Sequence, residues 1–109
     1  MEVKVFKQVE KILKNETREI REDIADILEK IVIGIPLGMP HVKSLASISS
    51  GLYEIRVKDR AGQFRLVYFI LYKDTIYLIH AFRKKTQKMN TSEKVVILKR
   101  LQEIKNEEN

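Results

Sequence analysis

The strongest constraint on how this chain folds is the stretch of residues 52–88, which has the pattern of three consecutive β-strands followed by a basic segment. The strands are predicted at Leu52–Asp59, Gln63–Tyr72 and Thr75–Phe82, and the basic segment is Arg83–Lys88. The middle strand is apolar or aromatic at nearly every position, which indicates a central strand buried on both faces. Arg65 interrupts it. A charged group in so apolar a strand is costly without a partner, so Arg65 is the first candidate for a functional residue.

The first strand has a different pattern, with apolar and polar residues in alternation. Tyr53, Ile55 and Val57 alternate with Glu54, Arg56 and Lys58. This period of two indicates a strand with one buried face and one polar face. Turns are predicted at 59–62 and 73–74, so the three strands should form an antiparallel meander.

Helices are expected on both sides of the strands in sequence. Residues 2–14 and 16–33 have apolar residues at helical spacing, and Asn15 and Thr17 have the character of a helix break and an N-cap. The two helices should form an αα-hairpin. Residues 34–51 have no clear period and are predicted to be a loop. A final helix should begin near residue 91, with Thr91 or Ser92 as N-cap and with Val95, Leu98, Leu101 and Ile104 as its apolar stripe.

These elements predict an α+β fold in the order α-α-β-β-β-α, in a single domain that covers residues 1–109. The helices should cover one face of the sheet. Part of the other face should stay open and be lined by Glu54, Arg56, Lys58 and Arg65.

Composition narrows the classes of function. The chain has no cysteine and only two histidines, His41 and His80, so disulfides, thiolate chemistry and a histidine-rich metal cluster are excluded. No apolar run is long enough to cross a membrane, and we expect no signal peptide. The lack of cysteine is compatible with a reducing cytoplasm.

Positive charge is concentrated in the strand region. The whole chain carries a net charge of +6, and residues 41–90 alone carry ten Lys or Arg against three Asp or Glu. Such a local excess favours a polyanion such as nucleic acid, or an acidic protein partner. The alternative is a solvated face that serves solubility.

The polar residues of the strands suit metal-free cleavage of RNA. Arg65 can share a face with the polar residues of the first strand, depending on register. His80 and Phe82 share one face of the third strand, from which the basic segment continues. Arginine and lysine can stabilise the charge that builds on phosphoryl oxygens when a 2′-hydroxyl attacks the phosphorus. His80, Glu54 or a lysine whose pKa is lowered by nearby cations can transfer protons, and Phe82 can stack a base.

Each of these residues also has a structural alternative. Glu54 can form an ion pair with Arg56 or Arg65 that only supports the fold. His80 can be a satisfied polar residue at a strand end, and Phe82 can belong to the core. The basic segment can be an ordinary solvated run.

Four segments together resemble a known family, and they cover about residues 5–104 in the same order. They are Met39–Leu45, Gly51–Arg56, Arg65–Phe69 and Leu78–Lys88. They are similar to the phage-derived, HigB-like branch of the RelE/ParE toxin superfamily. The resemblance implies a small RelE-like fold with an antiparallel sheet of three to four strands. It also implies the toxin of a type II toxin–antitoxin pair, typically a ribosome-dependent, metal-independent mRNA endoribonuclease without a cofactor.

The resemblance also implies partners and residue roles. The partners are a helix-turn-helix (HigA-like) antitoxin and mRNA on the ribosome. Arg65 matches the strand arginine that contacts the scissile phosphate, and Lys84 and Lys85 match the basic positions after the last strand. The residues assigned to catalysis are therefore Arg65, Lys84, Lys85, His80 and Glu54, and those assigned to RNA binding are Arg56, Lys58, Phe82, Arg83 and Lys88.

Two departures from the family pattern affect these expectations. The family usually opens with a β-strand, whereas residues 2–14 have a helical pattern, so that strand is predicted to be absent or very short. The usual proline after the paired lysines is replaced by Met89-Asn90. Two other functions are compatible with the resemblance: a ParE-type toxin that binds gyrase, and an inactive module that only binds the antitoxin.

Overall fold

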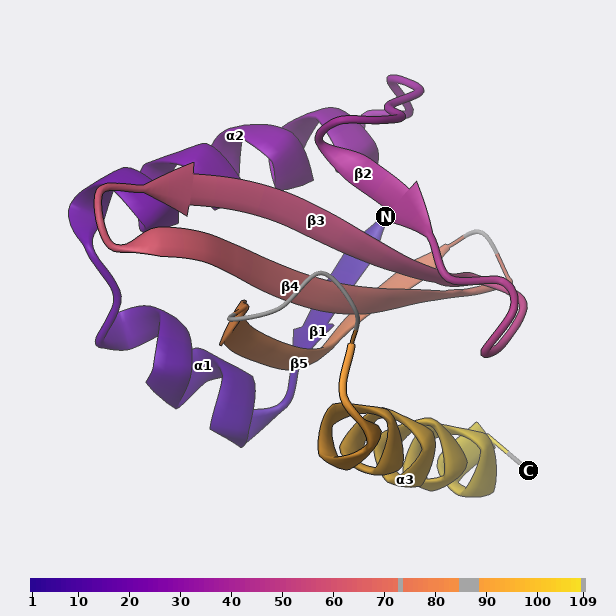
Figure 1. Cartoon of the computed structure of the whole chain (residues 1–109). Helices are drawn as coiled ribbons and strands as arrows, with labels where there is room; N and C mark the ends of the chain where they lie inside the picture. Colours follow the sequence, from indigo (N-terminus) through magenta and orange to yellow (C-terminus); the bar gives the residue numbers. More distant parts are fainter. Residues whose placement is uncertain (73, 85–88, 109) are drawn as a thin grey trace.

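The computed structural model describes residues 1–72, 74–84 and 89–108. Within these residues the fold has three helices and a mixed sheet of five strands (Figure 1). In chain order the elements are β1 (Glu2–Val5), α1 (Lys7–Lys14), α2 (Arg18–Val32), β2 (Val42–Ser44), β3 (Leu52–Asp59), β4 (Gly62–Leu71), β5 (Thr75–Lys84) and α3 (Thr91–Glu108). The strands lie in the order β1-β5-β4-β3-β2, so β4 is central, as its apolar pattern predicts.

The sheet is larger than the sequence pattern predicts, because both of its edges gain a short strand. The helix predicted over residues 2–14 begins only at Lys7, and Glu2–Val5 instead pair in parallel with β5. The sheet is therefore mixed, not purely antiparallel, and the prediction of three to four strands is corrected to five. The backbone groups at the edge of β5 give Glu2–Val5 hydrogen-bond partners that an isolated helical turn would lack.

The second added strand lies inside the segment predicted to be a loop. Val42–Ser44 pair with β3, with Lys43 opposite Glu54. Gly51 then allows the chain to enter β3, since its φ of +84° is disfavoured for other residues. A Cβ at this position would lie 3.0 Å from the carbonyl oxygen of Ile70, so the close approach of residue 51 to β4 also requires glycine.

Helices cover both faces of the sheet, which corrects the prediction that they would cover only one. Helices α1 and α2 pack on one face through Val9, Ile20, Ile24 and Ile27, against Ile55, Phe64, Leu66 and other residues of β3–β5. Helix α3 packs on the opposite face, against Leu52, Val67, Phe69, Tyr77 and Ile79. Figure 1 shows α2 and α3 on opposite sides of the sheet. Among the described residues, no helix is long and apolar enough to span a bilayer.

The ends and the apolar stripe of the helices follow the prediction only in part. Thr17 caps α2, as predicted, and its Oγ1 accepts a hydrogen bond from the Ile20 N–H. The cap of α3 is Asn90 and not Thr91 or Ser92, because Asn90 Oδ1 accepts the Glu93 N–H at 2.9 Å. The buried stripe of α3 is Ile97, Leu101 and Ile104, while Val95 and Leu98 of the predicted stripe are exposed.

Candidate functional site

The strand register brings most of the predicted site residues to one face of the sheet. Arg56 and Arg65 lie directly opposite each other on β3 and β4, and Phe82 lies opposite Arg65 on β5. Because side chains alternate along a strand, these positions share a face with Glu54, Lys58, Gln63 and Lys84. This is the face on which α3 packs, but the apolar contacts of α3 involve other positions of the sheet. We call Glu54, Arg56, Lys58, Arg65 and Lys84 the basic face.

One buried carboxylate holds the two arginines of the basic face. Glu54 Oε1 lies 3.7 Å from Arg56 Nε and 3.6 Å from Arg65 Nε. The side chains of Glu54 and Arg65 are only 2% and 4% exposed. Both Nε atoms lack a hydrogen-bond partner among the described residues. Two guanidinium groups therefore share one carboxylate, so the three side chains keep a net positive charge, which suits an anion.

Gln63 is a further member of this arrangement, and its role was not predicted. Its Oε1 accepts a hydrogen bond from Arg65 Nη2. Burial, and then the neighbouring charge of Arg56, lower the pKa of Arg65, while Glu54 opposes them. Arginine nevertheless stays charged in proteins. The guanidinium of Arg65 is therefore a fixed cation whose orientation is set by Glu54 on one side and Gln63 on the other.

Lys84 lies on the same face as the arginines. It lies opposite Gln63 at the end of β5. Burial and the positive charges of Arg65, Arg56 and Lys43 lower its pKa, although Glu54 acts in the opposite direction. A lysine with a lowered pKa has a larger neutral fraction near neutral pH and can accept a proton. Lys85 and Lys88, two further lysines that the sequence assigns to the site, lie outside the described residues.

His80 shares the face but is engaged by α3. Its Nε2 forms a hydrogen bond with Glu93 Oε2, and Arg100 Nη1 lies 3.3 Å from its Nδ1. Arginine only donates, so Nδ1 is the acceptor and the ring proton lies on Nε2, facing Glu93. Its ring also stacks on Phe82, with centroids 5.2 Å apart. This geometry matches the structural alternative for His80, a satisfied residue that ties β5 to α3.

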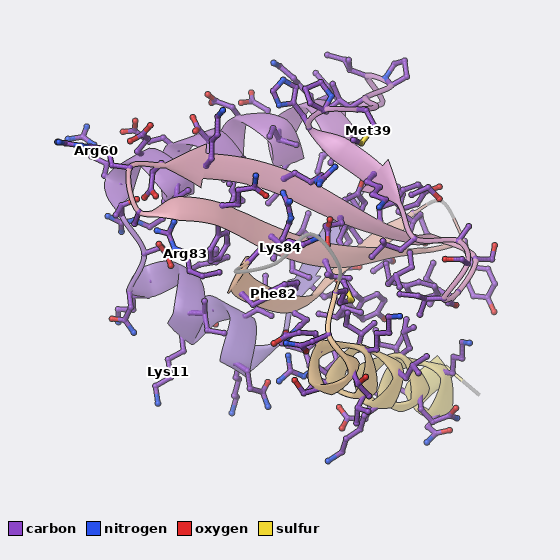
Figure 2. All side chains as sticks on the ribbon, viewed as in Figure 1. Lys11, Met39, Arg60, Phe82, Arg83 and Lys84 are labelled. Carbon is purple, nitrogen blue, oxygen red and sulfur yellow. The ribbon has the colours of Figure 1, made fainter. Side chains whose placement is uncertain are left out.

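The structure does not bring Arg83 to the basic face. Arg83 lies on the opposite face of β5, toward α1, between Phe82 and Lys84 in sequence (Figure 2). Its guanidinium donates to Glu16 Oε2 at 2.6 Å and to Asp59 Oδ1 at 2.7 Å. Asp59 also accepts from Thr17 Oγ1 at 2.9 Å. Arg83 therefore joins the segment between α1 and α2 to the β3–β4 hairpin, and its predicted contact with RNA is replaced by a structural role.

Replacing Arg83 should lower stability in a pH-dependent way. The hydrogen bond from Arg83 holds the pKa of the Asp59 carboxyl well below its ordinary value of 3.8. A carboxyl with a depressed pKa stabilises the fold above that ordinary value, and the contribution is lost as the pH falls. We expect Arg83→Ala to lower the melting temperature by several degrees at pH 7, and the difference from the parent to shrink between pH 4 and pH 2. Thermal melts followed by circular dichroism measure both effects.

The matched control is Arg18→Ala. Arg18 forms an exposed pair with Glu22, one turn along α2, and exposed pairs contribute little. A loss of stability in Arg83→Ala no larger than in Arg18→Ala would contradict the structural role of Arg83.

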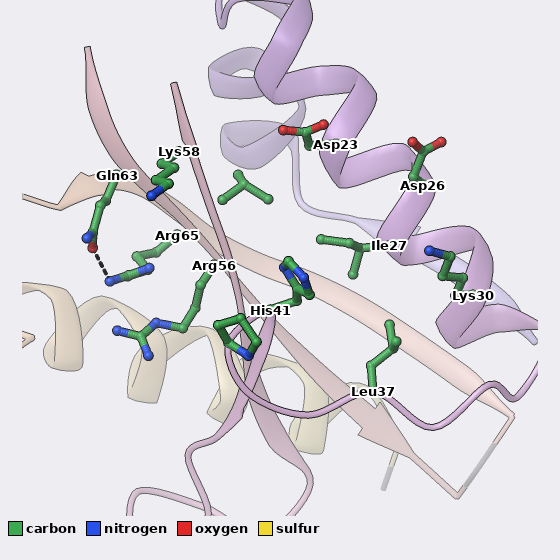
Figure 3. Close-up of a pocket in the computed structure, with 12 residues that line it drawn as sticks. Asp23, Asp26, Ile27, Lys30, Leu37, His41, Arg56, Lys58, Gln63 and Arg65 are labelled. Atoms are coloured by element: carbon green, nitrogen blue, oxygen red, sulfur yellow. Dashed lines mark hydrogen bonds between the residues drawn. The ribbon is translucent and has the colours of Figure 1, made fainter. Parts of the chain in front are cut away.

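A hollow of about 640 Å³ adjoins the basic face. Arg56, Lys58 and Arg65 line one side of it, and Asp23, Asp26 and Lys30 of α2 line the other (Figure 3). Leu37, Pro40 and His41, from the segment between α2 and β2, complete the wall. No functional role was predicted for Asp23, Asp26 or His41, because the approach of α2 to the edge of β3 leaves no local signal in the sequence. Within residues 1–72, 74–84 and 89–108, no three His, Asp or Glu side chains are grouped to hold a metal ion.

The chain matches a protein family in its sequence and a solved structure in its fold. The model of the family "Phage derived protein Gp49-like (DUF891)" matches residues 8–102, which is most of the chain. The chain belongs to this family. No curated protein matches it in sequence. Among solved structures, the Gp49-like chain is similar to the isolated E. coli RelE toxin in its P21 crystal form, with a TM-score of 0.52 and 15% sequence identity over 94% of this chain and 97% of that one.

The family match confirms the phage-derived part of the resemblance, and the structural similarity shows that the Gp49-like chain has a RelE-like α+β fold. The family match begins at residue 8, beyond β1, so it does not include the opening strand. The structure shows that this strand is present and four residues long, so of the two expectations, an absent strand or a very short one, the first is wrong.

Proposed function

We propose that this Gp49-like protein is the toxin of a toxin–antitoxin pair and cleaves mRNA on the ribosome without a metal ion. The observation that carries the proposal is the basic face, on which Arg56 and Arg65 flank a single buried carboxylate and Lys84 is close enough for its pKa to respond to the charges of all three. Guanidinium groups are donors suited to the oxygens of a phosphodiester. The RelE-like fold supports the proposal at the level of architecture.

In this proposal the arginines act on the phosphate and Lys84 acts on a proton. Arg65 and Arg56 donate to the non-bridging oxygens, where negative charge grows as the bond to phosphorus forms. Neutral Lys84 accepts the proton of the ribose 2′-hydroxyl as its oxygen attacks. The bond between phosphorus and the 5′ oxygen breaks, and the departing oxygen takes a proton from water or from a second acid. The products are a 2′,3′-cyclic phosphate and a 5′-hydroxyl.

The remaining predicted residues have supporting roles in the proposal. Glu54 orients Arg56 and Arg65 and is not the proton acceptor, because its side chain is buried between them. Lys58 contacts a flanking phosphate from the exposed end of β3. Phe82 is partly buried next to His80 and opposite Arg65. It also packs against the apolar cluster beneath α3, and in the proposal its ring supports a base beside the reacting phosphate.

The proposed partners follow from the same assignment. A helix-turn-helix antitoxin neutralises the toxin, and the ribosome presents the mRNA in the cytoplasm. The excess of positive charge in residues 41–90 would favour binding to both ribosomal RNA and an acidic segment of the antitoxin. A neighbouring gene that encodes a small helix-turn-helix protein would identify this antitoxin.

The proposed function is tested by expressing the chain alone and by co-expressing it with its neighbouring gene. We expect growth arrest when the chain is induced alone, and rescue by the neighbouring gene. Primer extension on cellular mRNA should then show new 5′ ends within translated regions. The same cleavage should appear when the purified protein, mRNA and ribosomes are mixed in a buffer containing magnesium for the ribosome.

Two further measurements separate the competing functions. A supercoiling assay that shows gyrase inhibition, with mRNA intact, would replace our proposal by the ParE-type function. Normal growth and intact mRNA in cells that lack the antitoxin would favour the inactive, antitoxin-binding module.

A further inference from the structure

The sheet ends at β1, and among the described residues this strand pairs only with β5. All four of its residues are exposed, and Val3 and Val5 are each 40% exposed. An open strand edge presents backbone donors and acceptors that can pair with a strand of another chain. Short length and charged side chains normally discourage such pairing. Because β1 carries Glu2 and Lys4, a partner strand is accepted only if its charges match theirs.

The backbone of β1 determines which of its residues can pair with a further strand. The N–H groups of Glu2 and Phe6 donate to carbonyl oxygens in β5 or just before it, at 2.9 and 3.1 Å. Alternate residues of a parallel strand face the same neighbour, so the register with β5 also turns the backbone of Lys4 toward β5. The backbone N–H and C=O groups of Val3 and Val5 therefore point away from the sheet.

The side chains of β1 divide into a charged side and an apolar side. Lys4 Nζ lies over the ring of Tyr77, 5.5 Å from its centroid, and Tyr77 belongs to the core that α3 covers. Alternation along the strand places Glu2 on the same side. Val3 and Val5 lie on the other side, next to strand residues of the core that α1 and α2 cover.

One antiparallel register satisfies both the backbone and the side chains when β1 pairs with β1 of a second copy. Outward-facing residues must oppose outward-facing residues, so Val3 can lie opposite Val3 of the second copy. In this register Glu2 lies opposite Lys4 on both sides of the two-fold axis, and Met1 lies opposite Val5. The two neighbouring registers place either Glu2 opposite Glu2 or Lys4 opposite Lys4, and like charges directly opposite are destabilising.

We propose that β1 is a self-association edge, at which a second copy of this chain pairs antiparallel about Val3. This inference goes beyond the proposed function and does not depend on it. The two five-stranded sheets would join into one, with both basic faces on the same side. Lys84 lies six residues beyond Leu78, the last residue of β5 that pairs with β1. At about 3.3 Å per residue this is about 20 Å along the strand, so the pairing leaves each basic face open.

Sedimentation equilibrium and amide hydrogen exchange over a wide range of protein concentration test the self-association edge. We expect a monomer–dimer equilibrium. The dimer should be weak, because a pair of four-residue strands buries less than the roughly 1,200 Å² at which stable interfaces begin. The amides of Val3 and Val5 should exchange more slowly as the concentration rises. The amide of Lys4 should not change, because it already faces β5 in the monomer.

Charge reversal tests the register. Glu2→Lys and Lys4→Glu should each raise the dissociation constant of the dimer about fivefold or more, because each variant places like charges opposite each other. An equimolar mixture of the two variants should associate as the parent does, since every opposing pair then has unlike charges. The matched control is Glu19→Lys, which changes the net charge as Glu2→Lys does but lies on the exposed side of α2. Thermal melts confirm that each variant is folded.

Three results would overturn the self-association edge. The first is a parent protein that stays monomeric at its highest soluble concentration. The second is a dimer that Glu2→Lys weakens no more than Glu19→Lys does, or that the mixture of folded variants does not restore, because such a dimer uses another surface or register. The third is slower exchange at Val3 and Val5 only after the protein encoded by the neighbouring gene is added, which would assign the edge to a strand of that protein.

Discussion

We expect Arg65→Ala to lower the rate of mRNA cleavage about 10²- to 10³-fold, which is the typical cost of removing one donor from a site that stabilises developing negative charge. The effect should be this large because the guanidinium is buried and held by Glu54 and Gln63. It therefore needs little rearrangement to meet the phosphate. Cells that express the variant should lose growth arrest. Cleavage is measured by single-turnover kinetics with ribosome-bound mRNA.

Removal of Arg65 also affects the fold, so the experiment needs a control for stability. Glu54 would keep only Arg56 as a partner, and a buried carboxylate with fewer partners is destabilising. Arg83→Ala is the control for stability, because Arg83 lies on the other face of β5 and supports the fold. This variant should lose stability without losing a residue of the proposed site. Below its melting temperature, Arg83→Ala should cleave at a rate close to that of the parent. Full toxicity of Arg65→Ala would refute the assignment of Arg65.

We expect Lys84→Arg to lower kcat/KM about 10²- to 10⁴-fold, the usual contribution of general acid–base catalysis. Arginine preserves the positive charge near the phosphate but cannot give up its proton at these pH values. In the parent protein the pKa of Lys84 is lowered from 10.5. The neutral, proton-accepting form therefore increases as pH rises, and kcat/KM should increase with pH and level off below pH 10.5.

The pH profile distinguishes a base from a positioning charge. In Lys84→Arg the increase with pH assigned to Lys84 should be missing, because the charge no longer changes. A variant that keeps both the parental rate and the parental profile would show that another group accepts the proton. Lys43→Arg serves as the matched control, because Lys43 contributes positive charge near Lys84 but is not assigned a proton transfer.

The sequence predicts the centre of this fold well and its edges poorly. The alternation in β3 and the continuous apolar run of β4 reflect local burial, so both strands and the hairpin between them were predictable. Residues 2–5 form a strand only because β5 offers them a parallel partner far along the chain, and no local pattern encodes such a contact. Four consecutive apolar residues, 95–98, fit more than one helical stripe, which explains why the buried side of α3 was assigned incorrectly.

The candidate site was predictable to the extent that it depends on strand alternation. Arg56, Arg65 and Lys84 share a face because the register pairs β3 with β4 and β4 with β5 in phase. Arg83 precedes Lys84 by one position and therefore points to the other face of β5. The prediction treated residues 83–88 as one basic segment and so did not separate the two faces. The engagement of His80 by Glu93 and Arg100 depends on where α3 packs, which the sequence pattern did not predict.

The central position of β4 has a consequence for how the basic face responds to a substrate. The strand carrying Arg65 is hydrogen-bonded to β3 and β5 on its two sides, so its backbone has little freedom to shift. Folding has already supplied the free energy that gathers like charges around Glu54. In the proposed reaction, this arrangement would avoid the reorganisation energy that water requires as negative charge grows on phosphorus. If the proposed cleavage is correct, its rate would come from rigidity established before the RNA arrives.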